Sequence, residues 1–299
     1  MNNQSETAGP RIGTCSWKYP SWKGLIYSDQ KDPDYLKEYA EHYDTVEVDQ
    51  WFWSLHGPGK IKLPDQKTVQ EYVQSVPDHF RFSIKIPNSV TLTHFYKRTH
   101  PDLTPNPGFL SVDLFHSFLS SLQPMRDHLG PLMFQFEYLN RQKMDSMEQF
   151  LKQFGEFIKK IPDHYDYAVE LRNPNYLKED YFQFLKTHGI SHVFVQGYYM
   201  PSIFELYDRY GDYIENETVI RLLGADRSGI EERAGGKWDR IVDSKDDELR
   251  YLRTMLSHLR DRHVSVYLNV NNHYEGSAPL TIEKIRQDLT SYSDRRIQE

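Results

Sequence analysis

The sequence is short of cysteine, because Cys15 is the single one among 299 residues. A lone cysteine excludes an internal disulfide and any metal site built from several thiolates. Positive charge is also scarce: 36 Lys and Arg stand against 43 Asp and Glu, for a formal net charge of -7. Such a chain lacks the general basic field by which proteins capture nucleic acid or anionic membranes, although a local basic groove stays open as an alternative.

Long apolar stretches are missing as well. No run approaches the ~18 consecutive apolar residues of a membrane span, and the first residues, MNNQSETAGP, lack the apolar core of a secretion signal. We therefore expect a cytoplasmic protein that makes no membrane contact. What the chain does have is 38% hydrophobic and 14% aromatic residues, enough for a sizeable globular core.

Strand-like runs rich in β-branched and aromatic residues alternate with helix-like segments. Eight strand-like runs lie at residues 12–17, 45–50, 81–87, 131–136, 167–172, 191–196, 218–223 and 264–270. The clearest helical patterns lie at residues 34–43, 111–129, 144–161, 176–189 and 246–262. This alternation predicts an α/β fold, a (β/α)8 TIM barrel. A doubly wound open sheet is the alternative, but the first run is not followed by a glycine-rich phosphate fingerprint.

The alternation runs without a linker-like stretch, so we expect one domain. Its predicted boundaries are a flexible N-terminus at residues 1–10, the barrel at residues 11–290 and a C-terminal tail at residues 291–299.

Polar and apolar residues alternate within the strand-like runs. Helices cover the outside of a barrel, so the side chains that face outward should be apolar. We therefore expect the polar side chains, which occupy every second position, to point inward; this is the inward parity. The inward charges would be Glu47, Asp49, Glu170, Lys85, Arg172 and Arg221, and the inward neutral polar residues Thr14, Ser16, Gln135, Gln196, Asn269 and Asn271. Buried charges persist when paired, so a structural network that closes the barrel is one interpretation. A functional site is favoured, because active sites of this fold lie at the C-terminal strand ends.

Long aromatic loops leave the same strand ends. They follow the second, third, sixth and seventh runs at residues 50–64, 88–109, 197–213 and 224–240, and loops of this length are often functional. The segment at residues 11–24, RIGTCSWKYPSWKG, carries Trp17 and Trp22. We expect these rings to wall a cleft, with packing against neighbouring loops as the alternative.

The sequence resembles the YecE-like family, the domain of unknown function 72. The resemblance rests on seven segments in order, at residues 13–24, 36–53, 80–94, 130–136, 167–176, 219–227 with the later Trp238, and 266–279. It implies a TIM barrel whose strand-end residues are Glu47, Lys85, Gln135, Glu170, Arg172, Arg221, Asn271 and Asn272. The chain departs from the family pattern at Asp49-Gln50 and Leu223-Gly224. The family has no established reaction, so the resemblance predicts the fold better than the function.

The family's barrel is similar to those of endonuclease IV and xylose isomerase, which use metals held by several His, Asp and Glu residues. Among 13 histidines, His192 is the one candidate for an inward strand end, while His94 and His273 lie in loops. We therefore expect no catalytic metal and no cofactor.

These observations favour a metal-independent enzyme, a hydrolase or lyase, acting on a small anionic ligand with a phosphate or carboxylate on a sugar-like or nucleotide-like body. Its predicted catalytic residues are Glu47, Lys85 and Glu170, with the two carboxylates as general acid and base and a Schiff base on Lys85 as a lesser variant. The predicted substrate-binding residues are Ser16, Trp17, Trp22, Gln135, Arg172, Arg221, Trp238, Asn271 and Asn272.

Two alternatives belong to other classes of protein. One is a nucleic-acid-binding protein, in which Trp17, Trp51, Phe95, Tyr198 and Trp238 stack on bases while Lys60, Lys62, Lys97, Arg98 and Arg227 contact phosphates. The acidic total weighs against it. The other is a ligand sensor without chemistry, which the same pocket charges would serve equally well.

Overall fold

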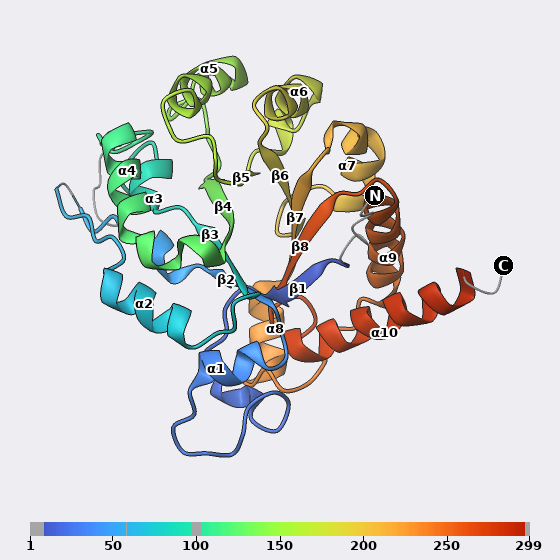
Figure 1. Ribbon diagram of the computed structural model, residues 1–299. Coiled ribbons are helices and arrows are strands. Elements are labelled where there is room, and N and C mark those ends of the chain that lie inside the picture. The colour runs from blue at the N-terminus through green and yellow to red at the C-terminus, as the bar shows by residue number, and fades with distance from the viewer. Residues whose placement is uncertain (1–8, 58, 97–102, 297–299) are drawn as a thin grey trace, which may run out of the picture. The chain divides into compact units, whose positions relative to one another are not determined.

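The computed structural model describes residues 9–57, 59–96 and 103–296, and its eight parallel strands follow chain order in a closed barrel (Figure 1). The strands are β1 (Arg11–Thr14), β2 (Thr45–Val48), β3 (Arg81–Lys85), β4 (Leu129–Phe136), β5 (Tyr167–Leu171), β6 (Ser191–Gly197), β7 (Glu217–Gly224) and β8 (Ser265–Val270). Each of the eight predicted runs overlaps one of these strands. The predicted TIM barrel is therefore confirmed.

Helices connect the strands, as the apolar spacing predicts. They are α1 (Tyr35–Ala40), α2 (Gln66–Gln74), α3 (Asn88–Thr91), α4 (Val112–Ser121), α5 (Met147–Ile158), α6 (Glu179–Thr187), α7 (Ile203–Tyr210), α8 (Arg227–Ala234), α9 (Asp246–Asp261) and α10 (Ala278–Arg296). Two short 3-10 turns follow the first strands, η1 (Pro20–Trp22) and η2 (Gln50–Phe52). In the described part of the chain, none of the helices is long and apolar enough to cross a membrane.

The chain divides into two compact units, one of residues 1–46 with 194–299 and one of residues 47–193. In the first unit β8 pairs with both β1 and β7, so that Asn269 lies in register with Gly13 on one side and with Arg221 on the other. Helix α9 packs against β8, and α10 against β1 and β8 (Figure 1).

In the second unit β3, β4 and β5 pair in order, and β5 also pairs with β6. Helix α5 shows why the sequence folds this way. Ser146 caps it by accepting a hydrogen bond from the backbone N–H of Gln149. Its buried side chains at a spacing of three and four include Phe150, Phe154 and Phe157. Two of these rings, Phe154 and Phe157, contact Phe134 of β4, so β4 turns its phenylalanines toward the helices.

The expected inward parity is wrong on two strands, β1 and β6. On β1, Thr14 donates from Oγ1 to the hydroxyl of Tyr39 in α1 across 3.0 Å, so it faces a helix. On β6, Gln196 donates to Glu248 of α9 and accepts from the backbone N–H of Ile203 in α7. Both side chains are polar yet face outward, because a helix offers each of them a hydrogen-bonding partner.

The C-terminal end also differs from the expectation. Helix α10 continues to Arg296, into the residues 291–299 for which the sequence predicts a tail. At the other end, β1 begins at Arg11, the first residue of the predicted barrel. The single-domain boundaries as a whole stay a prediction.

Candidate functional site

The strand ends of the 47–193 unit hold a buried ion pair. Lys85, the last residue of β3, places Nζ 3.1 Å from Oε1 of Glu47 in β2. The Lys85 side chain is 10% exposed and that of Glu47 is 0% exposed. The Lys85 ammonium also lies 5.9 Å from the centre of the Phe52 ring, which follows β2 in η2. The structure thus brings together two of the predicted catalytic residues, in surroundings that largely exclude water.

A second pair lies at the end of β5. The guanidinium of Arg172 donates to Oε1 of Glu170 through Nε at 2.6 Å and lies 2.5 Å from the same oxygen through its terminal nitrogen. Glu170 is buried, and Arg172 retains 21% of its side-chain exposure. Gln135 of β4 is in register with Glu170, so the two side chains share a face of the sheet. These strand ends therefore carry two acids, two bases and an amide.

Two buried asparagines fix the loops around these pairs. Asn88 accepts with Oδ1 from the backbone N–H groups of Ser54 and Leu55, which joins the loops after β3 and β2. Asn173 accepts from the backbone N–H of Leu139 at 2.7 Å and donates back to its carbonyl at 3.0 Å, which joins the loops after β5 and β4. Sequence reasoning missed both, since an asparagine's partner in another loop leaves no local pattern.

In the other unit, the strand ends of β7 and β8 carry Arg221 and Asn269. Both side chains are buried, at 3% and 0% exposure, and the two residues are in register. Neither the nitrogen nor the oxygen of the Asn269 amide has a hydrogen-bonding partner among the residues that the structure describes. A buried amide without partners is unusual in a native protein.

His273 connects the end of β8 with α8. Its Nδ1 lies 2.6 Å from Oδ1 of Asn271, and its Nε2 lies 2.9 Å from Oε1 of Glu231 in α8. Arg227 donates to the same oxygen of Glu231. Burial lowers the pKa of His273, and the hydrogen bond to Glu231 opposes this effect. Arg227 and His273, through their hydrogen bonds, lower the pKa of Glu231. Neither His273 nor Glu231 was among the predicted site residues.

Asn272 and two glycines set the backbone at this place. Asn272 accepts with Oδ1 from the backbone N–H of Ala278, the first residue of α10, so this predicted ligand-binding side chain has a structural task. Gly224 has φ +78, and a Cβ there would lie 2.2 Å from the His273 carbonyl oxygen. The glycine that follows Leu223, where the chain departs from the family pattern, is therefore required by a close approach of the end of β7 to the chain after β8.

The aromatic segment after β1 is packed rather than open. Trp22 is 0% exposed and Trp17 is 7% exposed. Trp22 packs against Tyr19 at 4.6 Å and Tyr27 at 6.0 Å between ring centres. Packing against the loop's own rings accounts for Trp22, while ligand contacts of Ser16, Trp17 and Trp22 stay predictions.

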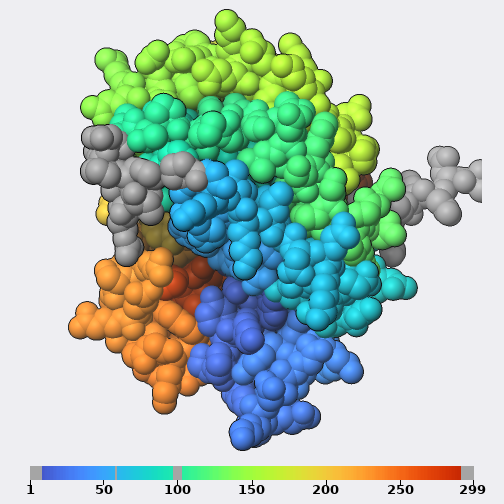
Figure 2. All heavy atoms as spheres, turned by 90° about the vertical axis from the view of Figure 1, so that its left-hand side faces the viewer, coloured from blue at the N-terminus to red at the C-terminus, as the bar shows by residue number. Residues whose placement is uncertain are grey.

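The same segment contacts the chain after α8. The backbone N–H of Trp238 donates to Oγ of Ser21, and the blue surface of the N-terminal segment adjoins the orange surface around α8 in Figure 2. The Trp238 ring meets His273 edge to face at 4.9 Å between ring centres. All five tryptophans lie after β1, β2 or β7, at positions 17, 22, 51, 53 and 238.

The residues predicted for nucleic-acid binding are in mixed surroundings. Trp51 stacks on Tyr72, and Phe95 is 5% exposed. Lys60 and Lys62 are exposed, and Arg227 is paired with Glu231. Lys97 and Arg98 lie outside the described residues. Nucleic-acid binding stays a prediction.

The histidine picked out for the barrel interior does not face it. His192 of β6 is in register with Val169, whose face of the sheet lies toward the helices, and its Nδ1 lies 3.1 Å from the Tyr181 hydroxyl of α6. His192 is therefore a core residue rather than a metal ligand. Within residues 9–57, 59–96 and 103–296, no three His, Cys, Asp or Glu side chains are grouped as a metal site.

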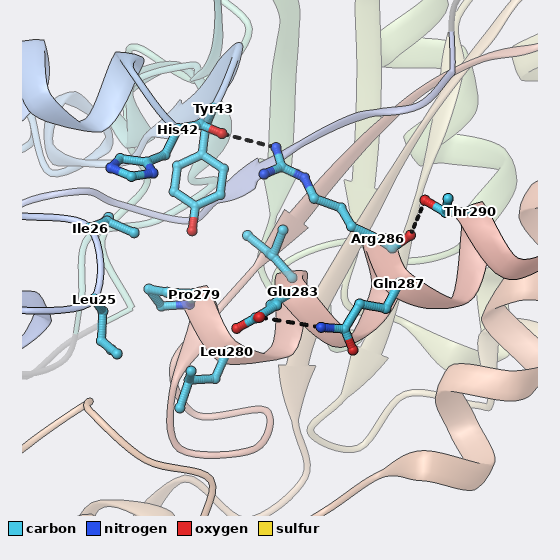
Figure 3. A pocket seen from close by; sticks show the side chains of 11 residues that line it. Leu25, Ile26, His42, Tyr43, Pro279, Leu280, Glu283, Arg286, Gln287 and Thr290 are labelled. Atoms are coloured by element: carbon cyan, nitrogen blue, oxygen red, sulfur yellow. Dashed lines mark hydrogen bonds between the residues drawn. The ribbon is translucent and has the colours of Figure 1, made fainter.

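A groove of about 740 Å³ lies away from these residues, on the helical side of the 1–46 and 194–299 unit. Figure 3 shows Leu25 and Ile26 on one side of it and the α10 side chains Leu280, Glu283 and Arg286 on the other. None of the predicted site residues lines it, so it does not bear on the strand-end chemistry.

Comparison with solved structures supports the fold. The chain superposes on a Thermotoga maritima DUF72 family protein with a TM-score of 0.65 at 20% identity, covering 95% of this chain and 100% of that one. An Enterococcus faecalis DUF72 family protein gives a TM-score of 0.64 at 20% identity, covering 92% and 94%. At such identity the likeness concerns the fold alone.

Comparison of sequences identifies the family. The chain is 25% identical over 165 residues to the protein YecE of Escherichia coli, which covers 55% of this chain. The match spans about half the length of that relative, at 49%. The family model described as "Protein of unknown function DUF72" matches residues 11–298, nearly the whole chain. The chain therefore belongs to the DUF72 family.

Proposed function

We propose that the chain is a metal-independent enzyme, a hydrolase or lyase, which acts on a small ligand bearing a phosphate or carboxylate. The observation that carries the proposal is the buried ion pair of Lys85 and Glu47 at the strand ends, with Nζ and Oε1 3.1 Å apart. A buried ion pair is a poor source of stability, because removing two charges from water costs about as much as their attraction returns. Its position at the C-terminal strand ends, where this fold carries its active sites, favours a functional origin.

The ligand would be held by the N–H groups of Lys85 and Arg172. A lysine ammonium has three N–H donors, and among the described residues Glu47 is the acceptor paired with Lys85. Two donors of Lys85 are thus available to an anion. The Arg172 side chain is 21% exposed beside Glu170, which suits a planar contact to a carboxylate or phosphate.

The two carboxylates would divide the acid and base roles. Glu47 is wholly buried and pairs with a lysine that is 10% exposed, whereas Glu170 pairs with an arginine whose side chain is 21% exposed. Carboxylates in unlike surroundings can be tuned to hold and release protons in turn. Gln135, in register with Glu170, would supply a neutral hydrogen-bonding group to the ligand body. These roles, with cytoplasmic location, are proposals.

A thermal-shift screen of phosphorylated and carboxylated metabolites tests the proposal, using wild type, Arg172→Ala and Arg11→Ala. Arg11 is a matched control, because it also pairs with a carboxylate, that of Asp44 at 3.3 Å, but at the start of β1. We expect at least one anion to stabilise wild type and Arg11→Ala. Arg172→Ala should bind it roughly 30-fold more weakly or worse, since truncating one partner of a desolvated pair typically costs ~2–5 kcal/mol.

The proposal fails if no anion stabilises the wild type, or if Arg172→Ala and Arg11→Ala respond alike. The pairs would then serve only to close the barrel. Metal independence is tested separately by elemental analysis of protein purified without chelator, where stoichiometric zinc, manganese or iron would overturn it.

A further inference from the structure

We propose that Arg221, Asn269 and Asn271 form a binding row for a hydroxyl-bearing oxyanion, such as hydrogen phosphate, and that the pair of Glu231 and His273 positions the Asn271 amide for it. The row lies on β7 and at the end of β8, within the unit of residues 1–46 and 194–299. This inference adds a binding site to the proposed function, and it takes from the proposed function the expectation that the ligand is a small anion.

Asn269 supplies the first argument. Its side chain is 0% exposed, and both atoms of its amide lack a partner in the described part of the chain. Its neighbours in register are Arg221, a cation, and Gly13, which has no side chain to offer. A buried amide is satisfied by protein, water or ligand. The Asn269 amide can be satisfied by a ligand that accepts a hydrogen bond from its nitrogen and donates one to its oxygen.

Asn271 supplies the second argument. It shares the parity of Asn269, and its backbone N–H continues the ladder by donating to the carbonyl of Leu222. Its Oδ1 accepts from the backbone N–H of His273 at 2.9 Å and faces Nδ1 of the same residue at 2.6 Å. Because a backbone N–H always donates, the oxygen and nitrogen of this amide are not interchangeable. The –NH2 group is therefore the end left for a ligand, and within the described residues it has no partner.

His273, in the turn after β8, links Asn271 to α8. Both of its ring nitrogens face oxygens, Oδ1 of Asn271 and Oε1 of Glu231. Both contacts are hydrogen bonds only when the ring carries two N–H groups, that is, when it is protonated. The charged groups around it are Glu231 and Arg227, both from α8, and the Trp238 ring adds a non-titrating edge contact. His273 has no ring nitrogen free for a substrate, so it is a positioning residue.

The hydrogen-bonding groups define the ligand. Arg221 and the two –NH2 groups donate to oxygens, while the Asn269 oxygen requires a donor from the ligand. Hydrogen phosphate has both, whereas sulfate at neutral pH has acceptors only. The row should therefore prefer phosphate to sulfate, and a comparison of the two at equal ionic strength separates recognition from general attraction of anions.

The test is thermal shift and calorimetry with inorganic phosphate and with sulfate, on wild type, Asn269→Leu and Arg172→Ala. Leucine has the same number and branching of side-chain heavy atoms as asparagine and removes an amide without partners, so Asn269→Leu should unfold at the wild-type temperature or above when phosphate is absent. We expect phosphate to stabilise wild type more than sulfate does, and Asn269→Leu to bind phosphate at least tenfold more weakly. The inference is overturned if wild type shows no preference, if Asn269→Leu keeps its affinity, or if it unfolds at a clearly lower temperature without phosphate.

The two proposals can fail separately. If Asn269→Leu loses phosphate and Arg172→Ala keeps it, the row stands and the proposed role of Arg172 falls. If Arg172→Ala loses the anion and Asn269→Leu keeps it, the row falls and the proposed function stands.

Glu231→Gln tests the positioning role by a pH profile. A glutamine can donate to Nε2 of a neutral His273, while Nδ1–H still donates to Asn271. Phosphate affinity should therefore fall more between pH 5.5 and pH 8 in wild type than in Glu231→Gln, by roughly threefold or more. The ionisation of phosphate is common to both proteins and cancels in the ratio. Equal profiles would show that His273 and Glu231 serve only to join α8 to β8.

Discussion

Lys85 and Glu47 form an ion pair whose two side chains are almost withdrawn from water, 10% and 0% exposed, with 3.1 Å between Nζ and Oε1. Losing one residue of such a pair lowers the stability of the protein strongly, whereas replacing both residues by apolar ones lowers it little. Removing one partner takes a counter-charge away from a buried charge, whereas an apolar pair of similar volume avoids the desolvation of both.

Lys85→Met alone should destabilise the protein by about 3–5 kcal/mol, because the buried Glu47 carboxylate then loses the ammonium paired with it. The double variant Glu47→Leu with Lys85→Met should recover most of this loss and yet lose any response to anions. Urea unfolding of both variants measures the difference. Equal stabilities for the single and double variants would contradict the coupling.

His192 should make the protein sensitive to acid. Burial lowers its pKa to about 3 in the folded protein, from 6.5 as the ordinary value. Below pH 6.5 the unfolded chain takes up the proton and the folded one does not, so stability is full above pH 6.5 and is lost as pH falls toward 3. The loss should be on the order of 2 kcal/mol at pH 5, at 1.36 kcal/mol per pH unit.

The variant His192→Gln should flatten this dependence, and the exposed His164 offers the matched control His164→Gln. Urea unfolding between pH 5 and pH 7.5 makes the comparison. An unchanged slope in His192→Gln would show that the acid sensitivity has another origin.

Gly224→Ala should destabilise the protein by about 2 kcal/mol or more. The added Cβ would lie 2.2 Å from the His273 carbonyl oxygen, in a backbone with φ +78. Gly235→Ala separates the two effects, since φ there is +59 but no atom lies within 4 Å of the added Cβ. It should cost only about 1 kcal/mol. Denaturant unfolding measures both losses of stability. Equal losses in Gly224→Ala and Gly235→Ala would show that the contact with the His273 carbonyl does not contribute.

Nucleic-acid binding predicts an affinity for single strands that falls steeply with salt, because released counterions drive it. We expect a labelled oligonucleotide to bind poorly even at low salt, given the net charge of -7. Fluorescence anisotropy at two salt concentrations decides this. Tight, strongly salt-dependent binding would instead favour this class over an enzyme of small ligands.

The sequence was sufficient for the order of the strands and for most of their faces. On β3, Phe82 and Ile84 lie on the opposite face to Ser83 and Lys85. The rule that the face toward the helices is apolar predicts the direction of all four side chains. The rule fails at Thr14 and Gln196, because it assumes that helices present only apolar groups. Tyr39 of α1 and Glu248 of α9 are polar groups that hydrogen-bond to these strand residues, and their positions depend on how the two helices pack.

The site was predictable where both partners end strands, as with Lys85 and Glu47. It was not predictable where a partner comes from a helix far along the chain. His273 and Glu231 are 42 residues apart, and neither the loop nor α8 has a motif that pairs them. A lone loop histidine is more often a surface or hydrogen-bonding residue than a metal ligand, but the sequence does not name the partners that His273 has here.

The placement of the tryptophans has a practical consequence for spectroscopy. All five follow β1, β2 or β7, so the tryptophan emission of this protein originates on its strand-end loops. Trp22 is fully buried while Trp53 is 60% exposed, so their emission maxima should differ and quenching by iodide should be selective. A ligand that binds at the strand ends should therefore change the tryptophan spectrum without any label.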